Sequence, residues 1–382
     1  MTEPVRIVLA PDSFKGSLTA PEVCDAIARG LARAIPGVET LARPMADGGE
    51  GTLDALLSAV GTRGVRAYEE VTGAGGARLR ASYGVIDGTT AVIEVAQVVG
   101  ITDPEGMRTH VEDRSTRGIG ELVARLVERG IRRFMIGLGG SSTNDGGSGL
   151  MHALGARLYD HSDRELAPTA RGLASVARVD ASGIAQRLRG VELSIMSDVD
   201  NPLCGTMGAT AIFGPQKGVP AADVERIDGA LARFAAASER SFGNAAADRP
   251  GSGAAGGLGF ALQLMGGTMR SGAEVVADLV RLDDALASAD WAITGEGRSD
   301  RQTLLSKAPF VVARHGRAKG VPVTLLSGAV DEAALADLHR HFTGCFALPP
   351  GPMSLDECIR DAASLLAARA EALGYVIAAA VK

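Results

Sequence analysis

Short apolar runs alternate with helix patterns at both ends of this 382-residue chain, and this alternation constrains the fold more than any other feature. The first run, Val5–Ala10, is aliphatic and β-branched, as in a strand buried on both faces of a parallel sheet. Thr19-Ala-Pro-Glu22 follows with the pattern of a capping box that opens a helix. Runs at Trp291–Thr294 and Val321–Leu326 begin the same alternation again, with a helix expected at Glu332–His341. A second capping box, Ser354-Leu-Asp-Glu357, predicts the start of a long final helix. The pattern predicts an α/β protein with a Rossmann-like, doubly wound parallel sheet.

The middle of the chain has a different pattern. Two runs of alternating residues flank Asp87-Gly88, a dipeptide typical of a tight β-hairpin, and helix and strand patterns alternate again from Ser115. We therefore expect a Rossmann-like domain made of residues 1–66 plus 286–382, with a second, mixed α/β domain inserted at residues 67–285. We expect a ligand cleft between these domains. The residues 251–259, rich in glycine and alanine, are a candidate loop or hinge.

Composition narrows the choice of partners. The net charge is −6 and no dense block of Lys or Arg occurs, which argues against a nucleic acid partner. The four cysteines match no zinc or Cys-x-x-Cys spacing, so we expect reduced thiols in a cytoplasmic protein. No uncharged apolar stretch approaches 18 residues, so we expect no membrane span. The sequence leaves a monomer and a homodimer equally open.

Each of five predicted strands is followed by a loop that combines small residues with a carboxylate. The loops read PDSFKGS, MADGGEGT, LGGSSTNDGG, SDVDN and GEGRSD in chain order. Ligands of open α/β sheets bind at the carboxyl ends of the strands, which is where these loops fall. Turns favour such residues in any protein, but five such loops in register with strand ends indicate a functional site.

The stretch Gly137–Gly149 (GLGGSSTNDGGSG) has the composition of a phosphate-binding loop. Its glycines allow backbone N–H groups to approach a ligand, and its hydroxyl and amide side chains add hydrogen bonds. We expect the positive N-terminus of the following helix to support an anion there. Gly48, Gly49 and Gly51 repeat the arrangement before a helix at Thr52–Val60. The only GxGxxG match, which begins at Gly251, follows no strand pattern, so we do not expect dinucleotide binding there.

Seven stretches of the chain resemble those of the type I bacterial glycerate kinases. They are APDSFKGSLTA, MADGGEGT, GLGGSSTNDGG, SDVDNPLCG, ATAIFGPQKG, GAAGGLGFAL and ITGEGRSDRQTL, and they run from Ala10 to Leu304. The resemblance implies ATP-dependent phosphorylation of D-glycerate by a Rossmann-like domain with an inserted α/β domain. It favours 2-phosphoglycerate as the product, and phosphorylation of the 3-hydroxyl stays open.

Phosphoryl transfer depends on positioning and on neutralising charge, so carboxylates that hold Mg²⁺ and cations that hold anions are needed. Lys15 and Arg298 could bind the carboxylate of glycerate. Asp198 follows the strand pattern Val191–Met196 directly, and it could hold metal, act as a base or merely cap its own turn. The candidate catalytic residues are Asp198, Lys15 and Asp47, and the candidate metal ligands are Asp198, Asp200 and Glu296. The candidate substrate and phosphate ligands are Ser13, Ser17, Gly48, Gly49, Gly139, Gly140, Ser141, Ser142, Thr143, Asn144 and Arg298.

Two other functions compete with this interpretation. A kinase of the sugar or mevalonate type has a similar glycine- and serine-rich loop, but such loops usually follow a proline, and Phe134-Met135-Ile136 stands there instead. A non-catalytic protein that binds a small acid would need no cluster of carboxylates, so the five acidic loops argue against it.

Overall fold

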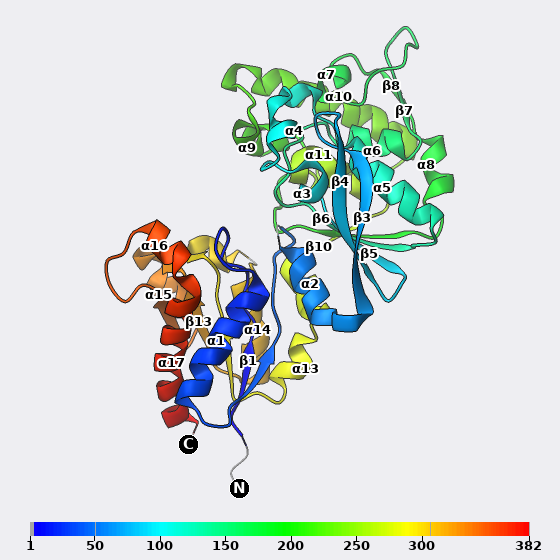
Figure 1. Ribbon diagram of the computed structural model, residues 1–382. Coiled ribbons are helices and arrows are strands. Elements are labelled where there is room, and N and C mark those ends of the chain that lie inside the picture. The colour runs from blue at the N-terminus through cyan, green and yellow to red at the C-terminus, as the bar shows by residue number, and fades with distance from the viewer. Residues whose placement is uncertain (1–3, 50, 306, 382) are drawn as a thin grey trace. The chain divides into compact units, whose positions relative to one another are not determined.

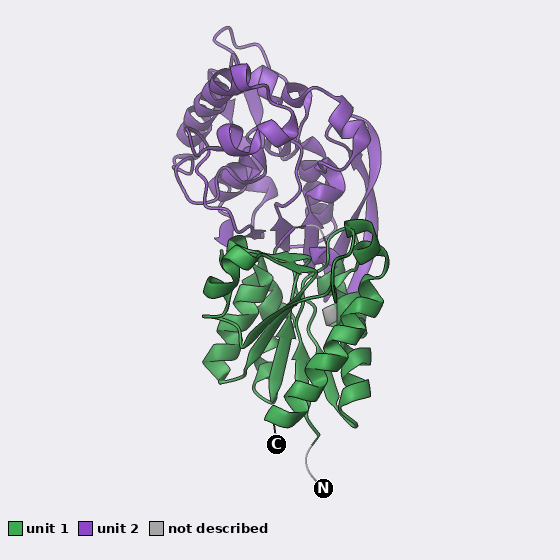
Figure 2. Ribbon diagram, turned by 90° about the vertical axis from the view of Figure 1, so that its left-hand side faces the viewer, with its two compact units in different colours: residues 1–47, 54–62, 271–382 green, residues 48–53, 63–270 purple. Residues whose placement is uncertain are grey.

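The structure is a computed structural model that describes residues 4–49, 51–305 and 307–381 (Figure 1). The chain divides into two compact units (Figure 2). Unit 1 consists of residues 1–47, 54–62 and 271–382, and unit 2 consists of residues 48–53 and 63–270. The domain limits expected from the sequence, after residue 66 and before residue 286, stay a prediction beside this division.

A parallel sheet of five strands forms the centre of unit 1, in the order β15-β13-β11-β1-β2. Every neighbouring pair in this sheet is parallel, as the apolar strand patterns predict. Its strands are β1 (Arg6–Leu9), β2 (Glu39–Ala42), β11 (Trp291–Thr294), β13 (Val323–Ser327) and β15 (Gly344–Ala347). Two short strands, β12 (Arg298–Ser299) and β14 (Ala329–Val330), pair separately.

Helices α1 (Ala20–Ala34) and α17 (Ala362–Ala380) lie side by side in unit 1 (Figure 1). The predicted capping box opens α1, because Thr19 and Glu22 bond each other's backbone N–H groups. The apolar stripe of α1 is buried against α17 and against one face of strand β1. A second group of helices, α12 (Gly272–Leu279), α13 (Leu282–Leu286) and α14 (Ala308–Lys319), packs together, and α14 contacts β11 and β13.

Two helix predictions near the C-terminus are only partly right. The helix expected at Glu332–His341 is a 3₁₀ turn, Glu332–Ala334, followed by the short α15 (Leu335–Leu338). The long final helix is broken into α16 (Leu355–Arg360) and α17, although the capping box at Ser354 is present. The break falls at Asp361, whose backbone has φ −101° and ψ 9°, and aspartate competes poorly for helix interiors.

Unit 2 contains a mixed sheet of six strands in the order β10-β9-β6-β5-β4-β3. Strands β3, β4 and β5 are antiparallel neighbours, whereas β5, β6, β9 and β10 run parallel. The hairpin predicted at Asp87-Gly88 is confirmed, and both residues have the positive φ that such a turn requires (51° and 66°). The strands are β3 (Gly64–Thr72), β4 (Arg78–Ile86), β5 (Thr90–Glu94), β6 (Arg133–Gly137), β9 (Glu192–Met196) and β10 (Thr268–Arg270).

Among the described residues, the helices and strands not yet named are short, except for three helices of unit 2. The longer helices of unit 2 are α5 (Arg117–Glu128), α10 (Val224–Phe242) and α11 (Ala254–Leu264). The short α-helices are α2 (Thr52–Val60), α3 (Ala96–Val99), α4 (Pro104–Arg108), α6 (Ser148–Ala153), α7 (Ala170–Leu173), α8 (Ser182–Arg187) and α9 (Ala209–Phe213). Strands β7 (Arg157–Tyr159) and β8 (Arg178–Asp180) pair antiparallel in a separate two-stranded sheet. The 3₁₀ turns are Gly61–Arg63, Val111–Asp113, Pro215–Lys217, Ala221–Asp223, Arg301–Leu304 and Glu332–Ala334.

The prediction of a loop or hinge at residues 251–259 is wrong. These residues are all buried, and α11 begins within them. Three consecutive residues at its start, Ala255, Gly256 and Gly257, have left-handed backbone (φ 51°, 66° and 91°). The glycines therefore shape a tightly packed helix start instead of providing flexibility.

Helix α17 is, within the described ranges, the one helix whose length and composition would allow it to cross a membrane. Core helices of globular proteins share this length and composition, and 39% of the apolar 18-residue window of α17 is buried. Arg369 lies within this helix, and its side chain donates hydrogen bonds to the carbonyls of Leu348 and Pro349.

Candidate functional site

The strand-end loops of unit 1 are tied together by main-chain hydrogen bonds. The loop after β1 donates from Asp12 N to the Gly295 carbonyl after β11 (2.8 Å). The loop after β2 donates from Met45 N to the Pro11 carbonyl (2.8 Å). The residues that follow three neighbouring strands thus lie close together at one edge of the sheet, as the strand-end argument predicts.

Asp12 is a functional candidate that our interpretation of the sequence missed. Its side chain is 6% exposed, and Oδ1 accepts a hydrogen bond from Ser13 N (2.6 Å). Burial, followed by repulsion from Asp47, raises the pKa of Asp12 to about 8, although Lys15 opposes the shift. A carboxyl group that titrates near neutral pH is suited to acid–base chemistry. The position of Asp12 just after a buried strand, which singled out Asp198, could have identified it.

Glu296 is held in a defined orientation after β11. Its Oε1 accepts hydrogen bonds from Ser299 Oγ (3.1 Å) and Thr303 Oγ1 (2.6 Å). Lys307 Nζ lies 3.5 Å from Oε2. Burial raises the pKa of Glu296, and these partners act against that shift. The carboxylate is therefore fixed by hydrogen bonds beside Asp12, whose pKa it also raises.

The predicted cationic and hydroxyl residues of unit 1 differ in their surroundings. Lys15 is exposed, and its charge acts on Asp12. Ser17 Oγ donates to the carbonyl of Ile359 (3.1 Å) in α16. Arg298 is largely exposed and lies 3.9 Å from Asp331. Lys15 is thus the predicted cation that shares the carboxylate cluster.

The predicted metal ligands do not form a metal centre by themselves. Glu296 belongs to unit 1, whereas the half-buried Asp198 and the exposed Asp200 belong to unit 2. Within the part of the chain that the structure describes, no three His, Cys, Asp or Glu side chains are placed to hold a metal ion. Mg²⁺ commonly takes one or two carboxylates and completes its shell with water and substrate phosphate, so oxygen donors of this kind fit it.

Two glycine-rich loops of unit 2 lie in direct contact. A Cβ on Gly137 would lie 2.4 Å from the Gly48 carbonyl oxygen, and one on Gly139 would lie 2.6 Å from Gly49 Cα. Both distances are too short for any side chain. The glycines of the two predicted phosphate loops therefore serve, in part, to bring these loops together.

The loop after β6 offers backbone donors that meet no acceptor among the described residues. In the described residues, no carbonyl or side chain accepts a hydrogen bond from the N–H groups of Gly139, Gly140 or Ser141. Gly140 is exposed and left-handed (φ 71°), whereas the side chains of residues 141–144 are buried. Gly140, with the half-buried Gly139 before it, therefore forms the accessible part of the loop, whereas the polar side chains that follow are buried.

The expectation that the next helix directs its N-terminus at a phosphate is wrong. Helix α6 begins at Ser148, beyond the loop residues, and Asp145 occupies its first backbone donors. The Asp145 carboxylate accepts from the N–H groups of Gly147 (3.1 Å) and Gly149 (3.2 Å) and from Thr116. An anion at the helix start would compete with a carboxylate already bound there.

Lys217 is a second residue that our interpretation of the sequence missed. Its side chain is 2% exposed, and Nζ donates to Ser141 Oγ (3.1 Å) and the Thr143 carbonyl (2.8 Å). It lies in ATAIFGPQKG, a stretch that resembles the kinase family, but the sequence Gly-Pro-Gln-Lys-Gly around it is typical of a surface turn. The packing that buries it joins segments far apart in the chain, so local sequence gave little signal.

The start of α11 supports the same loop. A Cβ on Gly256 would lie 2.0 Å from the Thr143 carbonyl oxygen, and one on Gly257 would lie 2.6 Å from Gly146 Cα. Gly146 N also donates to the Gly256 carbonyl (2.9 Å). The glycines of residues 251–259 thus brace the glycine-rich loop from behind.

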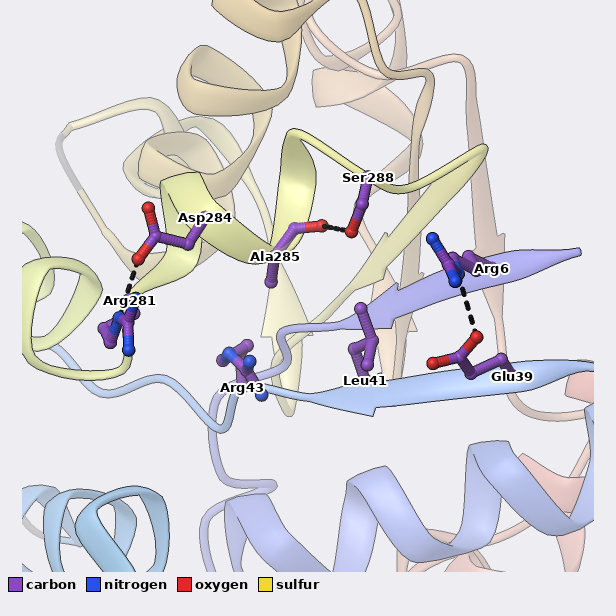
Figure 3. Close-up of a pocket in the computed structure, with 8 residues that line it drawn as sticks. All are labelled: Arg6, Glu39, Leu41, Arg43, Arg281, Asp284, Ala285 and Ser288. Atoms are coloured by element: carbon purple, nitrogen blue, oxygen red, sulfur yellow. Dashed lines mark hydrogen bonds and ion pairs between the residues drawn. The ribbon is translucent and has the colours of Figure 1, made fainter.

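A separate pocket of about 390 Å³ lies beside strand β2 in unit 1 (Figure 3). Two of its arginines are paired, Arg6 with Glu39 (2.8 Å) and Arg281 with Asp284 (2.6 Å). None of the predicted site residues, all of which the structure describes, lines this pocket. We therefore place the candidate site at the strand-end loops and not here.

Acid-bearing strand ends in one unit and glycine-rich backbone loops in the other are features of the α/β enzymes that act on phosphate-bearing ligands. The chain belongs to the glycerate kinase family, whose sequence profile matches residues 7–378. This result confirms the resemblance found in the sequence motifs.

Individual relatives agree with this assignment. A Bacillus subtilis protein named glycerate kinase is 40% identical over 99% of this chain and 98% of its own length. An Escherichia coli protein named glycerate 2-kinase is 37% identical over 94% of each chain. A crystal structure of a Salmonella typhimurium LT2 protein, described as a candidate glycerate kinase 2, has a TM-score of 0.87 and 38% identity, and covers 99% of both chains.

Proposed function

We propose that this protein transfers the terminal phosphoryl group of ATP to the 2-hydroxyl of D-glycerate, giving 2-phosphoglycerate and ADP. Glycerate kinase activity and the use of ATP follow from membership of the family. The choice of the 2-hydroxyl rests on the Escherichia coli relative, whose name specifies that position. Phosphorylation at the 3-hydroxyl is the alternative product.

The loop of residues 139–144 would bind phosphate of the nucleotide. The observation that supports this role is that the N–H groups of Gly139, Gly140 and Ser141 meet no acceptor in the part of the chain that the structure describes. Such clustered backbone donors bind phosphate oxygens without requiring a positive side chain. Ser142, Thr143 and Asn144 would hold the loop in shape, and Gly48 and Gly49 would form its neighbouring wall.

The carboxylate cluster of unit 1 would supply acid–base chemistry and bind the small substrate. Lys15 would hold the glycerate carboxylate as a point charge, with Arg298, Ser13 and Ser17 as further ligands. Burial, followed by repulsion from Asp47, raises the pKa of Asp12, so Asp12 could accept the hydroxyl proton as the phosphoryl group is transferred.

Asp198 is our first candidate in unit 2 for catalysis or metal binding. It follows β9 directly, so a rigid strand positions its backbone. We propose that Asp198, Asp200 and Glu296 include the protein ligands of Mg²⁺, which would neutralise phosphate charge when bound.

The finer description of the fold is also an inference. We infer that the sheet of unit 1 is doubly wound and Rossmann-like, because α1 with α17 and the α12–α14 group both pack on it. We infer further that residues 67–285 are an insertion between the two halves of that domain. A cytoplasmic location, and a monomeric or homodimeric state, stay predictions.

Release of ADP from ATP and Mg²⁺, with and without D-glycerate, tests the proposed reaction. Stoichiometric ADP formation that requires D-glycerate is the expected result. Turnover with sugars or mevalonate but not glycerate would favour the rival kinase class, and binding of glycerate without ADP release would favour a binding protein.

A further inference from the structure

A buried lysine lies directly beneath the glycine-rich loop. Lys217 ends the 3₁₀ turn Pro215–Lys217, and its Nζ bonds Ser141 Oγ (3.1 Å) and the Thr143 carbonyl (2.8 Å). Its side chain is 2% exposed, so solvent provides almost no hydration. An ammonium group in such surroundings is costly unless negative charge compensates it.

The hydrogen bonds of Lys217 suit a neutral amine. A neutral amine has two N–H donors, and within the described ranges Nζ meets two acceptors, one from Ser141 and one from Thr143. An ammonium group has a third donor, which meets no acceptor among those residues. Two acceptors of the same loop, Thr143 Oγ1 and Asn144 Oδ1, are buried without a partner in the described structure.

The charges of Arg114 and Asp145, the two charged groups that act on Lys217, cancel when the amine of Lys217 is neutral. Arg114 donates to the carbonyls of Lys217 (2.8 Å) and Ser142 (3.0 Å), and it is also buried. Asp145, in the loop, is the carboxylate that acts on Lys217. Burial, with a smaller contribution from Arg114, lowers the pKa of Lys217 to about 7, although Asp145 opposes the shift.

An anion on the other side of this loop would change that balance. Ser141 connects the two features, because its Oγ accepts a hydrogen bond from Lys217 Nζ (3.1 Å) and its own N–H, like those of Gly139 and Gly140, meets no acceptor among the described residues. Negative charge placed nearby in a low-dielectric region favours the protonated form of an amine. A phosphoryl group bound by these N–H groups would therefore draw a proton onto Lys217.

We propose that Lys217 is a proton-linked positioning residue, which takes up one proton from solvent when the phosphate of a nucleotide binds to loop 139–144. The step forms one N–H bond and converts the amine to an ammonium group, without any redox change. The inference rests on the proposed role of this loop in binding phosphate. It makes nucleotide affinity depend on pH through a residue buried beneath the ligand.

Calorimetric titration with ATP and Mg²⁺, without glycerate, tests this proposal at pH 8 in Tris and HEPES buffers. These buffers differ in ionisation enthalpy, so the difference in measured heat gives the number of protons taken up. With a pKa of about 7 in the free protein, wild type should take up about 0.9 proton per bound nucleotide at Lys217. Lys217→Met should lose that uptake, and the difference between the two proteins removes any contribution from Asp12.

The same Lys-to-Met substitution at a surface position provides the control. Lys319→Met, at the exposed end of α14, should keep the wild-type uptake. In wild type, the Kd for ATP should rise about tenfold per pH unit between pH 8 and 9, and this slope needs no variant to fold. In Lys217→Met the slope should be absent, which a merely structural role would not produce.

The results separate this inference from the proposed function. Wild type that binds ATP with neither proton uptake nor a pH slope would overturn the role of Lys217 while leaving the phosphate loop in place. Equal uptake in Lys217→Met and wild type would overturn it too. A Gly140→Val variant perturbs the left-handed residue of the loop itself, and unchanged ATP affinity in that folded variant would instead contradict the loop as the phosphate site.

Discussion

Replacing Asp12 by asparagine should stabilise the protein at neutral pH while impairing catalysis. The side chain is buried, and asparagine keeps both its size and the Oδ1 acceptor used by Ser13 N. What changes is the charge, which the folded protein accommodates poorly beside Asp47. Stability and activity should therefore change in opposite directions, as is common where a catalytic group is held in unfavourable surroundings.

The magnitude follows from the pKa of Asp12, which the fold raises from 3.8 to about 8. The native protein binds more protons than the unfolded chain between these pH values, so this group's contribution to stability falls as the pH rises through that window. At pH 7 the penalty amounts to at most about 4 kcal/mol of unfolding free energy. Asp12→Asn removes it, and kcat should fall about 10²-fold if the carboxyl acts as a base.

Urea unfolding at pH 4 and pH 7 measures this effect. The expected result is a gain in unfolding free energy for Asp12→Asn at pH 7 that nearly vanishes at pH 4. Asp25→Asn, at an exposed position of α1, removes one carboxylate without burial and should change little at either pH. A loss of stability at pH 7, or the same change at both pH values, would refute the reasoning.

Four further predictions concern other parts of the site. Asp198→Asn should lower kcat about 10²-fold at saturating Mg²⁺ with an unchanged Tm, and turnover within a few-fold of wild type would show that Asp198 is dispensable. Gly139→Ala should cost about 1–3 kcal/mol in urea unfolding, because its Cβ would meet Gly49 Cα at 2.6 Å. Because the fold lowers the pKa of Lys217 from 10.5 to about 7, its contribution to stability should rise with pH across that window in urea unfolding, and Lys217→Met should lose this rise. EDTA should abolish ADP formation and added Mg²⁺ should restore it, whereas full activity in EDTA would exclude a divalent ion.

The elements that the sequence predicts best are those specified by local chemistry. Helix Thr52–Val60 and strand Trp291–Thr294 have the predicted limits, and the capping boxes at Thr19 and Ser354 are present. Asp87-Gly88 forms its hairpin because the turn needs two residues with left-handed backbone, a conformation that Asp and Gly adopt readily. In each case a few neighbouring residues determine the outcome.

Features that depend on contacts between distant segments were not predictable in the same way. Residues 251–259 look like a flexible linker, yet their glycines are required because the Thr143–Gly146 backbone packs against them. Lys217 becomes a site candidate only when the fold carries it beneath a loop more than seventy positions earlier in the chain. In the sequence, Asp145 resembles the other carboxylates of the strand-end loops. In the structure, its carboxylate accepts hydrogen bonds from the N–H groups of Gly147, at the start of α6, and of Thr116.

The product of the reaction tests the central claim most directly. Phosphorus NMR of the mixture formed from ATP, Mg²⁺ and D-glycerate distinguishes the two isomers by proton coupling. A phosphate on C2 couples to a single carbon-bound proton and gives a doublet, whereas a phosphate on C3 couples to two protons and gives a triplet. We predict a new doublet that grows with ADP. A triplet would contradict transfer to the 2-hydroxyl, and the absence of any new phosphomonoester signal would contradict glycerate kinase activity.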